Sequence, residues 1–66
     1  MFKVGDKLIR KNSRKGFGEY SFEVLRVLND QYELLNVRSN ERPKLTVDFF
    51  TVHSALKLAI TELKNV

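Results

Sequence analysis

The chain has 66 residues, of which 42% are hydrophobic and 30% charged, a composition that fits one small globular domain and excludes a second core. It contains no cysteine, which excludes disulfides, thiolate metal ligands and a thiol nucleophile, and its apolar runs are far shorter than the roughly 20 residues of a transmembrane helix. The formal net charge of +4 favours an acidic partner, either nucleic acid or an acidic protein surface.

The short length also bears on the class of function. A domain of this size buries only about 60% of the surface that its unfolded chain exposes, which leaves little stability for a deep catalytic cleft. We therefore expect a binding protein and not an enzyme. Charged residues such as Lys3, Asp6 and Lys7 interrupt any apolar core of an export signal, so we expect a cytoplasmic location and no membrane association.

The first predicted element is a strand over Lys7–Lys11. A polar, basic loop at 12–18, which carries two glycines, separates it from the next strand. After this loop apolar and polar residues alternate, so that Tyr20, Phe22 and Val24 share one face. This alternation, which begins at Glu19, predicts a half-buried strand.

The alternation breaks at Val24, after which Leu25 and Val27 continue on the opposite face. Such a change of phase predicts a bulge or a strongly bent strand, the feature by which a small sheet curls into a barrel. Residues 29–30, Asn-Asp, form a turn signal between apolar runs, and the returning strand is predicted at Gln31–Arg38.

A further short strand is predicted at Lys44–Val47, after a polar loop at Ser39–Pro43. Its alternation directs Leu45 and Val47 inward. With this strand the sequence predicts four to five strands in all, each of them short.

After Asp48 the period of the apolar residues changes from two residues to 3.6 residues, which predicts a helix. Asp48 or Ser54 can act as the N-cap. We expect an irregular turn at Phe49–His53 and a regular helix from Ser54 to about Lys64, packed over the sheet or closing one end of a barrel. The apolar stripe consists of Phe49, Val52, Leu56, Ala59, Ile60 and Leu63.

Three stretches carry a family resemblance, namely Val4–Leu8, Glu23–Leu34 and Leu45–Phe49. They resemble the opening "VGD" strand, the central hairpin and the closing strand of KOW-like or Tudor-like modules. The resemblance implies a mainly β fold with a C-terminal α-helix. It would be a small SH3-like curled sheet or barrel at about residues 2–50 with a helix at about 54–64, in a single domain over 1–66. The predicted helix is longer than such barrels usually carry, so whether it covers their usual binding face stays open.

The positive charge is concentrated near the N-terminus. Residues 1–15 contain six basic residues against one acid, whereas the rest of the chain has a net charge of −1. This excess can meet phosphates or an acidic protein surface. The alternative is a solvated strand and loop whose lysines discourage edge-to-edge pairing of sheets. The residues concerned are Lys3, Lys7, Arg10, Lys11, Arg14 and Lys15, against Asp6.

The loop at Lys15–Gly18 places an aromatic ring beside cations, an arrangement on which a nucleic-acid base can stack while lysines hold the phosphates. It resembles the first ribonucleoprotein motif, with Phe22 at the far end, although Glu19 stands where that motif has a stacking aromatic residue. The alternative is that Phe17 folds back onto the barrel.

These observations lead to a first hypothesis, a non-enzymatic module that binds DNA or RNA with weak sequence specificity. Phosphates would meet Lys7, Arg10, Lys11, Arg14 and Lys15, a base would stack on Phe17 or Tyr20, and Arg38, Arg42 and Lys44 would extend the patch.

The second hypothesis is a small adaptor or inhibitor, of the kind that viruses and mobile elements encode, that docks on a larger host enzyme. The adjacent rings of Phe49 and Phe50 bear on it, because only one of two neighbours fits the apolar stripe. Phe50 would then be exposed and available to a partner protein. The alternative is that both rings cap the open ends of the barrel.

No chemistry beyond binding is indicated. His53 is the only histidine, and without cysteine or a second histidine we expect no metal site. The acidic residues form no recognisable acid–base pair, and no phosphate-binding glycine motif is present, so we expect no catalytic residue and no cofactor. His53 is expected to be partly exposed near the start of the helix. The oligomeric state stays open.

Overall fold

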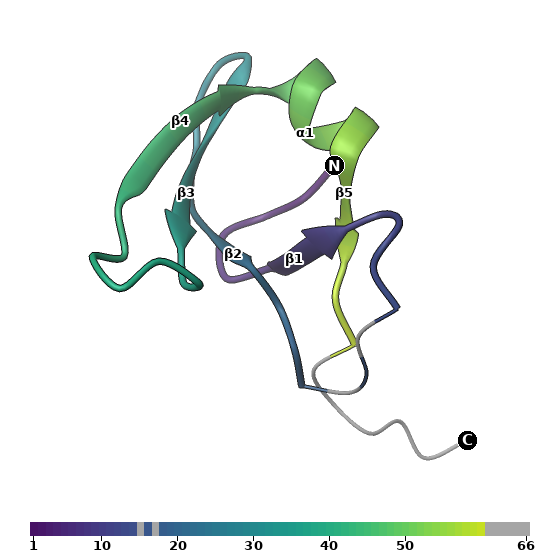
Figure 1. Cartoon of the computed structure of the whole chain (residues 1–66). Coiled ribbons are helices and arrows are strands. Elements are labelled where there is room, and N and C mark those ends of the chain that lie inside the picture. Colours follow the sequence, from purple (N-terminus) through teal and green to yellow (C-terminus); the bar gives the residue numbers. More distant parts are fainter. Residues whose placement is uncertain (15, 17, 61–66) are drawn as a thin grey trace.

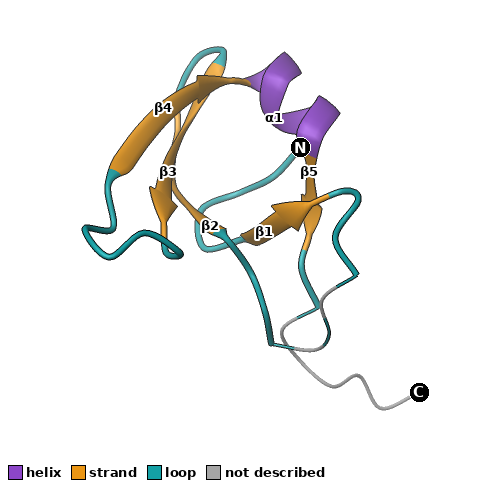
Figure 2. Cartoon of the chain, viewed as in Figure 1, coloured by secondary structure: helices purple, strands orange, loops and turns teal. Residues whose placement is uncertain are grey.

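The computed structural model describes residues 1–14, 16 and 18–60 (Figure 1). The predictions made for Lys15, for Phe17 and for the end of the helix after residue 60 lie outside these residues. The described part of the chain is mainly β with one short helix late in the sequence, as predicted (Figure 2). Its elements are β1 (Lys7–Arg10), β2 (Phe22–Val27), β3 (Gln31–Asn36), β4 (Lys44–Asp48), α1 (Phe49–Ala55) and β5 (Leu56–Leu58).

The strands form one antiparallel sheet in the order β4-β3-β2-β1-β5. Figure 1 shows that this sheet is strongly curled, so that its strands follow one another around a ring. The edge strands β4 and β5 are joined directly by α1, which spans the remaining side of the ring. The fold therefore surrounds a single interior with strands and one helix.

The bulge predicted in the second strand is confirmed. The register between β2 and β3 shifts between Val24 and Arg26, so that Leu25 is the additional residue. A bulge of this kind bends the strand and increases its twist, which allows a five-stranded sheet to curl. The hairpin predicted at residues 29–30 is confirmed too, and the amide of Leu28 donates to the carbonyl of Gln31 at 2.8 Å.

The core lies inside the curl and receives buried side chains from four strands and the helix. Phe2, Phe22, Val47 and Phe49 pack against it. Leu45 was expected to point inward with Val47, but it is 39% exposed because it lies at the open mouth of the curl. The buried residues of this core are Leu8, Val24, Tyr32, Leu34, Val52 and Leu56.

The prediction for the helix is wrong in both its limits. Phe49–Ala55, expected in large part as an irregular turn, is helical, whereas Leu56–Leu58 is the strand β5. Asp48 is the N-cap, one of the two predicted, and its carboxylate accepts from the amide of Thr51 at 2.9 Å. The helix ends because the backbone of Leu56 is extended, and β5 then pairs with the otherwise free edge of β1. Pairing satisfies the backbone groups of β1, which a continued helix would leave without strand partners.

The loop after β1 returns along β5 before β2 begins. The amide of Lys11 donates to the carbonyl of Ala55 at 2.9 Å, and the amide of Gly18 donates to that of Ile60 at 2.7 Å. The strand predicted from Glu19 starts only at Phe22, because the amide of Glu19 bonds within a turn to the carbonyl of Gly16. This course brings the basic loop close to both ends of β5.

Candidate nucleic-acid interface

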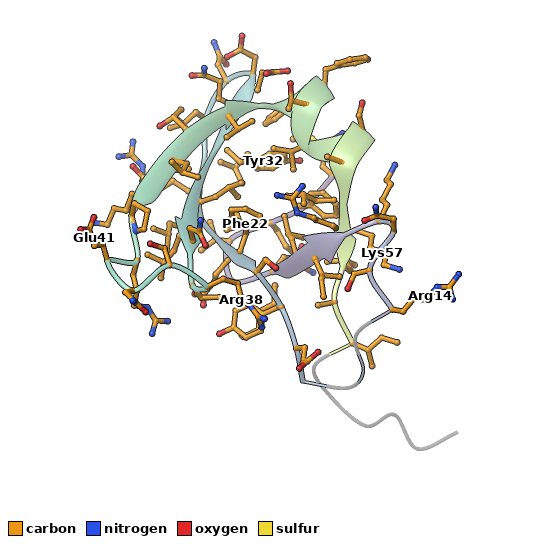
Figure 3. All side chains as sticks on the ribbon, viewed as in Figure 1. Arg14, Phe22, Tyr32, Arg38, Glu41 and Lys57 are labelled. Atoms are coloured by element: carbon orange, nitrogen blue, oxygen red, sulfur yellow. The ribbon has the colours of Figure 1, made fainter. Side chains whose placement is uncertain are left out.

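Four exposed cations lie along β1, the loop after it and the neighbouring strand β5. We call this set of side chains, Arg10, Lys11, Arg14 and Lys57, the basic edge. Strand pairing places Lys57 opposite Ile9, and the hydrogen bond from Lys11 to Ala55 holds the loop against the end of α1. Figure 3 shows Arg14 and Lys57 on the same side of the molecule. The fold thus adds one cation from β5 to three from the N-terminal quarter.

A shallow depression of about 300 Å³ adjoins the basic edge. Arg10 and Lys11 line it together with Asn12, Ser54 and Ala55. The depression therefore combines two cations with an amide and a hydroxyl group, side chains that commonly contact phosphate oxygens. No ion pair within the described residues holds the basic edge to an acidic side chain, so these charges are available to a ligand.

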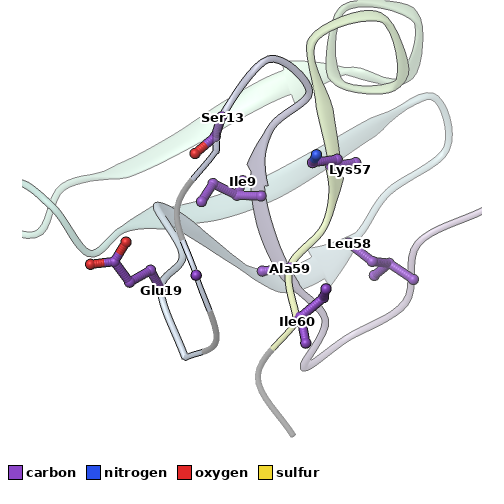
Figure 4. A pocket seen from close by; sticks show the side chains of 8 residues that line it. Ile9, Ser13, Glu19, Lys57, Leu58, Ala59 and Ile60 are labelled. Carbon is purple, nitrogen blue, oxygen red and sulfur yellow. The ribbon is translucent and has the colours of Figure 1, made fainter. Parts of the chain in front are cut away.

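Glu19 limits the basic edge on one side. It lines a second depression of about 180 Å³ together with Ile9, Ser13 and Lys57. Figure 4 shows Glu19 and Lys57 on opposite sides of Ile9. The carboxylate of Glu19 repels phosphate, so a phosphate chain is expected to follow the side of the edge that carries Arg10 and Lys11.

Lys7 and Tyr20, two of the predicted ligands, contact each other instead of forming part of the basic edge. The Nζ atom of Lys7 lies 5.6 Å from the centroid of the Tyr20 ring, a cation–π arrangement. Strand pairing also places Lys7 opposite Glu23. One face of the half-buried Tyr20 ring is therefore occupied by a side chain of the same molecule.

Arg38, Arg42 and Lys44 belong to β4 and the loop that precedes it, far around the sheet from β1. Figure 3 shows Arg38 well apart from Arg14 and Lys57. Lys44 is paired with Leu35, and strands β3 and β2, the latter carrying Glu23, stand between it and Lys7. The structure does not bring these three cations to the basic edge, because β3 and β2 separate β4 from β1 in the sheet.

Sequence reasoning missed Lys57, Asn12 and Ser54. The sequence predicts Lys57 within a helix, and a helix would not place it opposite Ile9 of β1. The alternation of Leu56, Lys57 and Leu58 was the available signal for a strand, although three residues are too few to establish a period.

Phe50 is exposed over 81% of its surface, whereas Phe49 packs against the core. The ring centroid of Phe49 lies 4.5 Å from that of Tyr32, and its plane is stacked with that of His53. The alternative in which both rings cap the barrel is therefore wrong for Phe50. Its ring is positioned on the surface of α1 and accessible to a partner.

His53 lies within α1 and is half-buried in an aromatic cluster. Its Nε2 atom is 2.6 Å from the hydroxyl oxygen of Tyr32, which also accepts the amide of Phe2 at 3.1 Å. The Phe2 ring meets the His53 ring edge-on at 5.2 Å. Among the described residues no group of three or more His, Asp or Glu side chains is placed to hold a metal ion. These contacts give His53 a structural part in fixing the N-terminal segment.

No protein-family model matches the chain, and no curated protein or solved structure matches it either. In the part of the chain that the structure describes, no helix is long and apolar enough to cross a membrane.

Proposed function

We propose that this chain is a non-enzymatic module that binds nucleic acid by contacts to phosphates along the basic edge. The observation that carries the proposal is that Arg10, Lys11, Arg14 and Lys57 are all exposed along three neighbouring segments, and that Arg10 and Lys11 line a depression that also contains Asn12 and Ser54. Such side chains position a phosphate backbone without reading the bases. Binding with weak sequence specificity follows, since among the described residues that line the depression Asn12 has the only amide side chain.

The fold supports a related proposal, that the domain is an SH3-like barrel. The curled five-stranded sheet and the bulged β2 support this proposal, although the helix lies between β4 and β5 and not after the last strand, where the resemblance implies it. With α1 limited to Phe49–Ala55, the helix is short enough to leave the outer surface of β1 and β5 open.

The proposal is tested by titrating fluorescein-labelled 12-nucleotide DNA and RNA, single- and double-stranded, with the protein and recording anisotropy. The test variant combines Lys11→Gln, Arg14→Gln and Lys57→Gln. The matched control combines Arg26→Gln, Arg38→Gln and Lys44→Gln, which removes the same charge from exposed positions on other segments.

We expect the test variant to bind at least tenfold more weakly than the control variant at 50 mM salt. Equal losses in the two variants would show that only net charge matters, and no binding of the unaltered protein at micromolar concentration would refute the proposal altogether.

One observation favours the second function, a small adaptor or inhibitor that docks on a larger enzyme. The exposed ring of Phe50 is the kind of aromatic anchor that dominates many protein interfaces. Affinity capture from the source cell with the unaltered protein and with Phe50→Ser tests this function. A stoichiometric partner that survives nuclease treatment and is lost with Phe50→Ser would support it.

A further inference from the structure

An apolar pocket of about 160 Å³ opens at the mouth of the curl, between β4, α1 and the ends of β1 and β5. The pocket is open to solvent, since Leu45 on its rim is 39% exposed. Its walls are formed mainly by Phe22, Leu34, Leu45, Val47, Val52 and Leu56.

The size of the pocket specifies what can fill it. An apolar cavity of about 150 Å³ in a protein interior stays dry and accommodates one benzene ring. The pocket therefore has room for a single phenyl ring or a branched aliphatic side chain. It is too small for a packed helix or for two adjacent side chains.

Charge on the rim restricts the ligand further. Arg10 lines both the pocket and the adjoining depression, where Lys11 is its neighbour. The acid closest in sequence to the lining residues of α1 is Asp48, whose carboxylate already accepts both the amide and the hydroxyl of Thr51. A ligand that presents carboxylates beside its apolar group thus meets a guanidinium and an ammonium group.

The same lining argues against a nucleic-acid base. A base inserted into the pocket buries donors and acceptors on its edges, and each loses its hydrogen bonds to water unless the protein replaces them. Of the described residues in the lining, only Arg10 and Thr51 have polar side chains, and the hydroxyl of Thr51 already donates to Asp48. An apolar amino-acid side chain has no such requirement.

We propose that this pocket binds one aromatic or large aliphatic side chain from an acidic segment of a partner protein, whose flanking carboxylates contact Arg10 and Lys11. The site shares Arg10 and Lys11 with the basic edge but adds an apolar cavity, so binding of the side chain and binding of phosphates are tested separately. It also differs from the role considered for Phe50, because here the partner inserts the side chain and this chain supplies the cavity.

The probe is a labelled seven-residue peptide in which one phenylalanine is flanked on each side by three acidic residues. Two further peptides serve as comparisons, one with alanine in place of phenylalanine and one with lysines in place of the acids. The protein variants are Ala55→Leu, which places a larger side chain at the exposed edge of the pocket, and Arg10→Gln. Arg26→Gln, on the outer part of β2, is the charge-matched control, and thermal unfolding verifies that each variant is folded.

We expect the alanine peptide to bind about tenfold or more weakly than the phenylalanine peptide, which is the effect of burying one ring. Ala55→Leu should weaken the phenylalanine peptide by a similar factor, Arg10→Gln should weaken it severalfold, and Arg26→Gln should not. The peptide comparison needs no change in the protein and so holds even if Ala55→Leu does not fold.

Equal binding of the phenylalanine and alanine peptides, or equal binding of the acidic and lysine peptides, would overturn the proposal. So would the absence of any binding of the acidic phenylalanine peptide. Failure of phosphate binding alone, measured with variants of Arg14 and Lys57, leaves this result unaffected.

Discussion

Replacing Tyr32 with phenylalanine removes one hydroxyl group from the centre of the fold. The Tyr32 side chain is fully buried, and its hydroxyl oxygen accepts the amide of Phe2 at 3.1 Å and lies 2.6 Å from Nε2 of His53. The ring itself is kept in Tyr32→Phe, so its contacts with Phe2 and Phe49, at centroid distances of 5.8 and 4.5 Å, are preserved. The substitution therefore isolates the two hydrogen bonds.

The expected loss of stability follows from the two polar groups, on Phe2 and His53, that lose their partner in Tyr32→Phe. A buried donor or acceptor without a partner costs about 1–3 kcal/mol, and because Phe2 and His53 are only half-buried the lower part of that range applies, about 1–2 kcal/mol. For a domain of this size 1 kcal/mol corresponds to about 4–8 °C in Tm, so we expect a decrease of about 4–16 °C. This is a large fraction of the stability of a chain whose total lies at about 3–10 kcal/mol.

The assay is thermal unfolding followed by circular dichroism at pH 7, with Tyr20→Phe as the matched control. The Tyr20 ring contacts Lys7 through its face, so removal of its hydroxyl should change Tm by no more than a degree or two. If Tyr32→Phe is as stable as Tyr20→Phe, the network of Phe2, Tyr32 and His53 does not hold the N-terminal segment, and the role assigned to His53 is wrong.

Three further predictions concern other parts of the fold. Hydrogen bonds from the Thr51 hydroxyl and then from the Thr51 amide lower the pKa of Asp48, so this cap stabilises the fold above the ordinary aspartate pKa, and its contribution is lost as pH falls through the lowered value. The difference in Tm between the unaltered protein and Asp48→Ala, present at pH 7, should therefore shrink as pH falls below the ordinary aspartate pKa, and a constant difference would contradict the cap. Arg42 has a φ of 50°, in the left-handed region, so Arg42→Gly should stabilise by about 0.5–1 kcal/mol in urea unfolding, and a net loss would show that its side chain matters more than its backbone. Leu56→Ala should cost about 2–5 kcal/mol and Leu58→Ala less than about 0.5 kcal/mol, whereas similar losses at the two positions would contradict the strand β5.

The parts of the fold that depend on short-range patterns were predictable from the sequence. The phase change after Val24 indicated the bulge because two consecutive apolar residues cannot share one face of a strand. The Asn-Asp turn at 29–30 identified the hairpin for a similar local reason. The exposure of Phe50 followed from the rule that one of two adjacent rings leaves an apolar stripe.

The strand β5 was not predictable in this way. Leu56 fits a helical stripe with Val52 as well as it fits a strand with Leu58, and the stripe is longer than the three residues of β5. The pairing of β5 with β1 determines that Leu56–Leu58 is a strand and not part of a helix. This pairing joins segments far apart in the chain, so no local sequence pattern indicates it.

In the candidate site, too, local sequence indicates some residues, whereas contacts between distant segments determine others. Arg10, Lys11 and Arg14 are close in sequence, so their charge excess was visible without a structure. Lys57 joins them because β5 pairs with β1, whereas Arg38 lies apart from them because it precedes β4, which β3 and β2 separate from β1. Local charge thus indicated the location of the candidate interface, whereas the set of residues that belong to it depends on the strand topology.

The salt dependence of oligonucleotide binding tests the central claim most directly. Four phosphate contacts at Arg10, Lys11, Arg14 and Lys57 predict a slope of log K against log salt of about −3.6 for duplex DNA and about −2.8 for a single strand. Removing three of them with Lys11→Gln, Arg14→Gln and Lys57→Gln should reduce the magnitude of the duplex slope to about 0.9, while Arg26→Gln, Arg38→Gln and Lys44→Gln together should leave it close to −3.6. Identical slopes for the two triple variants would contradict the assignment of phosphate contacts to the basic edge.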